Sequence, residues 1–73
     1  MIIAIDFDGV LARTEYPTIL GPMPYVCEAM TQLHSDGHTL IVNTCREGEE
    51  LTNAINWLLS QRIPFDIVND NTP

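Results

Sequence analysis

The sequence contains no lysine, and its 3 basic residues are all arginines, against 10 acidic side chains. The formal charge of −7 argues against a nucleic-acid partner, because nucleic-acid binding depends on Lys and Arg side chains that neutralise phosphates. It argues equally against an anionic membrane surface. A chain of 73 residues has room for one domain. Its core is small, so we expect its fold to need further stabilisation by a cross-link or a partner.

Long apolar runs and cysteines are also scarce. The longest apolar run, from Met1 to Ile5, is far shorter than the ~18 residues of a membrane helix. No basic segment precedes it, as one would in a signal peptide. Cys27 and Cys45 lack the paired spacing of a metal or redox motif. We therefore expect both to be reduced thiols with a packing role in a cytoplasmic protein.

The apolar pattern alternates between the periods of strands and helices. It predicts strands at 1–5, 39–43 and 65–68, one helix at about 24–35, and a second helix through Leu51, Ala54, Ile55, Leu58 and Leu59. Residues 10–22 contain Pro17, Gly21 and Pro22, which indicate an irregular loop or flap.

This β-α-β-α-β order predicts parallel strands in a three-layer Rossmann-like α/β sheet. The first strand is continuously apolar, which is typical of a strand buried on both faces. Ligands of such sheets bind beyond the carboxyl ends of the strands. The residues that follow each strand are therefore the candidates for chemistry.

The first strand ends in two carboxylates separated by one residue. Alternation along the chain predicts that Asp6 and Asp8 point to a common side, and Gly9 permits a tight turn close to a small ligand. Two such carboxylates can hold Mg²⁺, which completes its shell with water and substrate phosphate. An aspartate can also attack phosphorus to form an aspartyl-phosphate.

The second strand is followed by groups suited to phosphate. Thr44 offers a hydroxyl, Thr44 and Cys45 offer backbone N–H groups, and Arg46 offers a planar guanidinium. The second helix begins nearby and adds a favourable field for an anion. Thr44 has a simpler interpretation as a cap of the following turn, and Arg46 has one as a surface ion pair with Glu47 or Glu49.

The segments Ile2–Val10 and Leu40–Arg46 resemble the first two motifs of the haloacid dehalogenase-like (HAD) phosphohydrolases. In the first motif a hydrophobic strand precedes D-x-D-G-[TV], and in the second a strand ends in Thr or Ser. The resemblance, which points to a small capless bacterial subgroup, implies Asp6 as nucleophile and Mg²⁺ ligand. It implies Asp8 as general acid/base that also gives the metal its backbone carbonyl, and Thr44 as a phosphate ligand. The implied sheet has strand order 5-4-1-2-3.

The resemblance covers about the first half of a family domain, so residues 1–73 read as one incomplete domain. The family's third motif is a Lys or Arg, for which Arg46 is the best placed substitute. Its acidic fourth motif is absent, and Asp66 and Asp70 are weak replacements. The missing strands leave the first strand as an exposed apolar edge. We therefore expect either a fragment of a longer protein or a homo-oligomer that covers this edge.

These patterns predict a Mg²⁺-dependent phosphatase that acts on a phosphorylated small molecule through Asp6 and Asp8. The alternative is a catalytically incomplete HAD-like fragment or subunit that binds metal or phosphate without turnover. A receiver-type signalling domain also carries acids at strand ends. The D-x-D-G turn and the absence of a late lysine speak against it.

Overall fold

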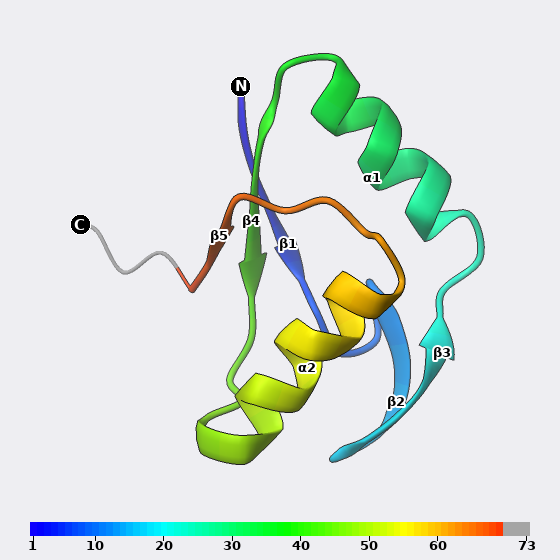
Figure 1. The fold of residues 1–73 in the computed structure, drawn as a ribbon, viewed down its shortest axis with the longest axis vertical. Helices are drawn as coiled ribbons and strands as arrows, with labels where there is room; N and C mark the ends of the chain where they lie inside the picture. Colours follow the sequence, from blue (N-terminus) through cyan, green and yellow to red (C-terminus); the bar gives the residue numbers. More distant parts are fainter. Residues whose placement is uncertain (70–73) are drawn as a thin grey trace.

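The computed structural model describes residues 1–69 of the chain. The elements follow the order β1 (Ile2–Asp6), β2 (Ala12–Glu15), β3 (Thr18–Pro22), α1 (Val26–Ser35), β4 (Thr39–Asn43), α2 (Gly48–Ser60) and β5 (Ile67–Val68) (Figure 1). The predicted parallel α/β sheet is confirmed, with strand order β1-β4-β5 and parallel pairing at both junctions.

Both helices pack on one face of this sheet. Leu40 and Val42 of β4 point to the same face, and both belong to the buried cluster that contains Met30 of α1 and Leu58 of α2. Figure 1 likewise shows α1 and α2 on the same side of the strands. Residues 1–69 thus form two layers, and the third layer of the predicted architecture is not among them.

The one-sided packing decides how β1 is buried. Ile3 and Ile5 pack against the core, whereas Ile2 is 70% exposed and Ala4 is also exposed. The prediction of a strand buried on both faces is therefore wrong for the described residues, because no helix among them covers the second face. As predicted, β1 is an edge strand of their sheet, with β4 as its one neighbour.

Residues 10–22 are more regular than the sequence indicated. Most of them form an antiparallel hairpin of β2 and β3, in which Glu15 pairs with Thr18 across the turn at Tyr16 and Pro17. The prediction of an irregular loop was wrong because its Pro and Gly residues stand where a hairpin tolerates them. Pro17 lies in the turn, and Gly21 and Pro22 end an edge strand.

The third parallel strand is shorter than predicted. Pairing with β4 begins at Ile67 rather than at Phe65, because the Asp66 carboxylate accepts the N–H of Leu40 at 2.7 Å in place of a backbone carbonyl. The first helix begins at Val26, two residues after the predicted start, and ends before Gly37, which has φ of 87°.

The two helices of the described residues are short and amphipathic. Neither of them has the length and apolar character required to cross a membrane.

Candidate functional site

A cavity of about 600 Å³ lies beyond the carboxyl ends of β1 and β4. Its lining includes five residues that the sequence singled out, Asp6, Asp8, Thr44, Cys45 and Arg46, together with Phe7, Asn43, Glu47 and Asn69. Parallel pairing places Asp6 opposite Asn43 at the end of the ladder, which explains why segments almost forty residues apart meet here. The fold therefore gathers these candidates at one end of the sheet.

The loop after β1 winds tightly around one carbonyl. The Phe7 carbonyl oxygen accepts hydrogen bonds from the N–H groups of Val10, Leu11 and Ala12 at 3.0–3.3 Å. Gly9 has φ of 81°, in the left-handed region that side chains with a Cβ disfavour. Gly9 does not line the cavity. It lies in the turn that follows Asp6 and Asp8.

Asp6, like Glu47, is a cavity carboxylate without a hydrogen-bond or ion-pair partner among the described residues. Among residues 1–69, no hydrogen bond or ion pair occupies its side chain, and none occupies the backbone carbonyl oxygen of Asp8. Carboxylate and carbonyl oxygens are ligands that Mg²⁺ accepts alongside water. These two groups fit the predicted magnesium site, although no three His, Cys, Asp or Glu side chains gather for a metal in this part of the chain.

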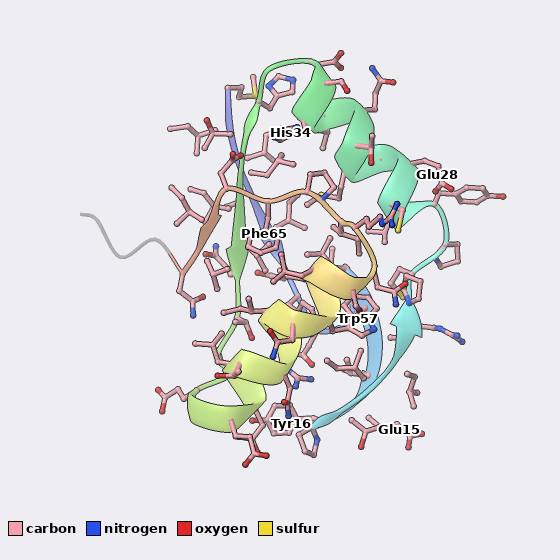
Figure 2. The ribbon with its side chains drawn as sticks, viewed as in Figure 1. Glu15, Tyr16, Glu28, His34, Trp57 and Phe65 are labelled. Carbon is pink, nitrogen blue, oxygen red and sulfur yellow. The ribbon has the colours of Figure 1, made fainter. Side chains whose placement is uncertain are left out.

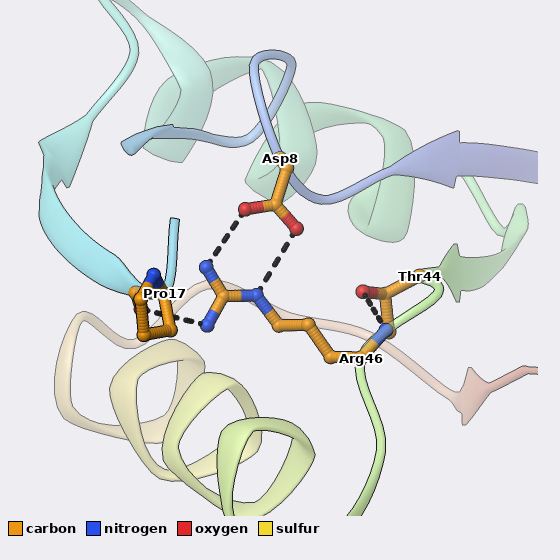
Figure 3. Close-up of polar contacts among 4 residues, drawn as sticks. All are labelled: Asp8, Pro17, Thr44 and Arg46. Carbon is orange, nitrogen blue, oxygen red and sulfur yellow. Dashed lines mark hydrogen bonds and ion pairs between the residues drawn. The ribbon is translucent and has the colours of Figure 1, made fainter. Parts of the chain in front are cut away.

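Asp8 forms a bidentate ion pair with Arg46 (Figure 3). Arg46 Nε donates to Asp8 Oδ2 at 3.0 Å and Nη2 donates to Oδ1 at 2.7 Å. The third nitrogen, Nη1, donates to the Pro17 carbonyl oxygen at 3.0 Å. Arg46 is 2% exposed. The alternative of a surface pair with Glu47 or Glu49 is therefore wrong, and the guanidinium is engaged on all three nitrogens.

The ion pair fixes the charge state of both partners. The hydrogen bonds from Arg46 hold the pKa of Asp8 below its usual value, against the opposing effect of burial. The same bonds raise the pKa of Arg46. The ion pair therefore favours the carboxylate form of Asp8, because a protonated Asp8 would lose its charge-assisted bonds to Arg46.

Thr44 is oriented by two neighbours. Its backbone N–H donates to Asn69 Oδ1 at 2.8 Å, and its hydroxyl oxygen accepts the N–H of Arg46 at 3.1 Å. The predicted turn cap and the predicted ligand are compatible, because a hydroxyl that accepts one bond still has its own hydrogen to donate. The Thr44 N–H, in contrast, is already used within the chain.

Cys45 lies beside Thr44 with its side chain exposed. The prediction that this thiol packs in the interior is therefore wrong, because the chain between β4 and α2 turns Arg46, and not Cys45, inward. Glu47 precedes α2 without a side-chain cap of its N–H groups. The first N–H groups of α2 thus lack a capping side chain near the cavity.

The charge balance of the cavity is negative. Asp8 and Arg46 neutralise each other, which leaves Asp6 and Glu47 as the remaining charged lining residues. Other acidic side chains, such as Glu15 and Glu28, lie on the outer surface (Figure 2). The remaining lining charges would therefore repel a phosphate dianion.

Asn69 and Asn43 are cavity residues that the sequence analysis did not identify. Asn43 ends β4 and Asn69 directly follows β5. Asn69 has φ of 54°, and its N–H donates to the Val42 carbonyl oxygen at 2.8 Å. Their position after an apolar run was the available signal. Asp70, considered as a replacement acid, lies outside the described residues, and Asp66 lies at the other end of β5, hydrogen-bonded to Leu40.

Among the solved structures similar to this chain are two bacterial proteins. A conserved protein from Bacteroides thetaiotaomicron shares 37% sequence identity at a TM-score of 0.90, over 100% of this chain and 60% of that one. A structural-genomics target from Vibrio cholerae shares 23% identity at a TM-score of 0.71, over 99% of this chain and 70% of that one. The chain thus spans about 60% of the length of the Bacteroides protein. No protein-family model and no curated protein matches it.

Proposed function

We propose that this chain carries the nucleophilic half of a Mg²⁺-dependent phosphohydrolase of the HAD type, with Asp6 as the attacking group. The observation that carries the proposal is the unengaged Asp6 carboxylate at the end of β1, in a cavity that also contains Thr44. Asp6 stands at the carboxyl end of a parallel strand, where ligands of such sheets bind.

The charge of the cavity supports a metal-dependent reaction. Asp6 and Glu47 repel a phosphate dianion, and the Arg46 charge is balanced by Asp8. A bound Mg²⁺ ion would neutralise the phosphate oxygens and make the phosphorus more electrophilic. The Asp6 carboxylate and the Asp8 carbonyl are the groups that would hold it, and the Thr44 hydroxyl would donate to a phosphate oxygen.

In the proposed reaction, an Asp6 carboxylate oxygen attacks phosphorus while the bond from phosphorus to the leaving oxygen breaks. The leaving oxygen departs with the bonding electrons and takes a proton from solvent water, and the proton that the attacking water loses in the second step restores the balance. Water then attacks phosphorus, the bond from phosphorus to Asp6 breaks, and the Asp6 carboxylate and inorganic phosphate result. One group on the chain thus makes and loses a single covalent bond in each turnover.

The Asp8–Arg46 ion pair sets the preferred leaving group. General acid catalysis contributes about 10²–10⁴-fold, and an ionised Asp8 cannot supply it to the first step. Aryl phosphates, whose leaving oxygens are stable as anions, need that proton least. We expect turnover of an aryl phosphate to exceed that of an alkyl phosphate by a margin of this order.

The test compares phosphate release from an aryl phosphate by the wild-type chain and by Asp6→Asn, with and without Mg²⁺. Asn keeps the size of the side chain and removes the nucleophilic charge, so release should fall to background while the circular dichroism spectrum stays unchanged. Asp36→Asn, at the end of α1 and outside the cavity lining, is the matched control and should retain wild-type activity. Release that persists in Asp6→Asn would refute the proposal.

The second candidate is a unit that binds metal or phosphate without turnover. It is favoured by the engagement of Asp8 with Arg46, since the second carboxylate is then withdrawn from acid–base chemistry. Calorimetric Mg²⁺ binding that Asp6→Asn abolishes, in a folded chain that releases no phosphate, would select this candidate.

A further inference from the structure

Arg46 joins three segments that are distant in sequence. Its backbone lies between β4 and α2, its Nε and Nη2 atoms bind Asp8 after β1, and its Nη1 atom binds the Pro17 carbonyl oxygen in the hairpin turn. The side chain is 1% exposed. A buried charge is stable only where it is paired and hydrogen-bonded. The loss of one of these contacts therefore weakens the position of Arg46 in the others.

Aromatic rings complete the surroundings of the guanidinium. Its central carbon lies 5.2 Å from the centroid of the Phe7 ring and 5.0 Å from that of the Tyr16 ring. Tyr16 is 65% exposed and lies at the tip of the hairpin, where it is labelled in Figure 2. The two turn residues thus meet the same side chain, Tyr16 through its ring and Pro17 through its carbonyl.

We propose that Arg46 is a positioning residue that fastens the tip of the β2–β3 hairpin and the side chain of Asp8 to each other. The hairpin tip cannot move away from Arg46 without losing the hydrogen bond to the Pro17 carbonyl oxygen. Asp8 cannot turn toward a leaving group without releasing Arg46. The catalytic consequence rests on the proposed function, whereas the fastening of the hairpin does not.

The fastening is tested by amide hydrogen exchange on the full chain, in wild type, Arg46→Lys and Arg46→Met. Arg46→Met keeps the apolar stem and removes the donors, so protection of the hairpin amides should fall about tenfold or more, the scale expected for a lost hydrogen bond to a charged group. Protection of the β4 amides of Ile41 and Val42 should fall less. Lys carries a single ammonium group and cannot form the two parallel hydrogen bonds of a guanidinium. Arg46→Lys should therefore retain only part of the wild-type protection.

Arg13→Lys is the matched control, because Arg13 lies exposed within the same hairpin. It should leave the hairpin amides at wild-type protection. If Arg46→Met lowers hairpin and β4 protection by the same factor, Arg46 merely stabilises the whole domain and the proposal is wrong.

A second variant covers the case in which replacement of Arg46 prevents folding. Asp8→Asn keeps the side-chain size and one acceptor oxygen but removes the charge that holds the guanidinium. It should lower hairpin protection in the same pattern as Arg46→Met. Unchanged hairpin protection in Asp8→Asn would overturn the proposal.

Turnover gives an independent readout wherever the wild-type chain releases phosphate. A positioning role predicts that Arg46→Lys lowers kcat more than it raises KM. An unchanged kcat with a raised KM would instead make Arg46 a phosphate ligand and overturn the proposal. If no chain releases phosphate, the proposed reaction fails, while the exchange pattern still decides whether Arg46 fastens the hairpin.

Discussion

At the scale of single residues, the burial of Arg46 is the feature that governs the site. A guanidinium that is 2% exposed is stable here because Asp8, Pro17 and two aromatic rings satisfy it. Removing one partner from such a pair is far more costly than the pair is stabilising, because a charge is then left buried and unpaired. The ion pair therefore controls both stability and the protonation of Asp8.

This ion pair predicts how stability depends on acidity. The pKa of Asp8 is lower in the folded chain than in the unfolded chain, chiefly because of its hydrogen bonds from Arg46. A lowered pKa stabilises the fold above the unfolded value of about 4. We expect this contribution to the free energy of unfolding to be lost as the pH falls from about 4 through the folded pKa. The guanidinium keeps its charge throughout this range, because its pKa is raised.

Urea unfolding of wild type and Asp8→Asn between neutral pH and about pH 3 measures this contribution. Asn cannot be protonated in this range, so the variant should lose less stability on acidification than the wild type. Parallel pH profiles of the two proteins would show that Asp8 contributes nothing to acid sensitivity.

The strand-end residues could be predicted from the sequence, but the partner of Arg46 could not. Asp6, Asp8 and Thr44 come directly after apolar runs of the sequence. The rule that ligands bind beyond the carboxyl ends of parallel strands therefore sufficed to place them at one end of the sheet. Asp8 and Arg46 are 38 residues apart, and nothing local marks them as partners. The neighbouring glutamates were the natural candidates, and only the turn that directs Arg46 inward removes them from its reach.

At the scale of elements, helices and buried strands could be predicted because their apolar spacing is repeated. β4 coincides with the predicted strand at 39–43. The hairpin was not predicted because apolar and polar residues do not alternate along its sequence, although the exposure of its residues does. Its contacts with Arg46 and with the core are tertiary contacts that a local pattern does not contain.

The apolar stripe of α2 was also predicted one residue too wide. Leu58 and Leu59 both belong to the predicted spacing, but Leu58 is 1% exposed and Leu59 is 61% exposed. Trp57 lies off the predicted stripe, yet its ring meets that of Phe7 edge to face, with centroids 5.7 Å apart. Adjacent positions of a helix differ by about 100°, so periodicity alone cannot set the edge of a buried face.

This difference gives a matched pair of stability predictions within one helix. Leu58→Ala leaves a cavity in the core and should lower the free energy of unfolding by about 2–5 kcal/mol. Leu59→Ala removes the same atoms from a largely exposed position and should change it by about 0.5 kcal/mol or less. Urea unfolding of both variants checks the pair. Similar losses in the two variants would mean that Leu59 is covered by something outside residues 1–69.

At the scale of the whole molecule, one face of the sheet carries no helix among the described residues, and one edge of it has no neighbouring strand. Both helices lie on the opposite face, and β1 has a single neighbour. Thr39 N–H bonds the Met1 carbonyl and Phe7 N–H bonds the Asn43 carbonyl. The alternation of a strand then directs the backbone groups of Ile2 and Ala4 to the open edge. An edge of this kind, without Pro or Lys, favours pairing with another strand.

We propose that a second copy of the chain covers this edge, and a charge at the start of β1 tests the proposal. Ile2 is 70% exposed, so Ile2→Lys should be accepted by the fold while it opposes strand pairing between copies. Light scattering should show that wild type associates as its concentration rises and that Ile2→Lys remains monomeric. Leu20→Lys, at an apolar hairpin position that is 53% exposed, controls for added charge and should associate like wild type. A wild-type chain that stays monomeric at high concentration would refute the proposal, because the edge would then be stable in water by itself.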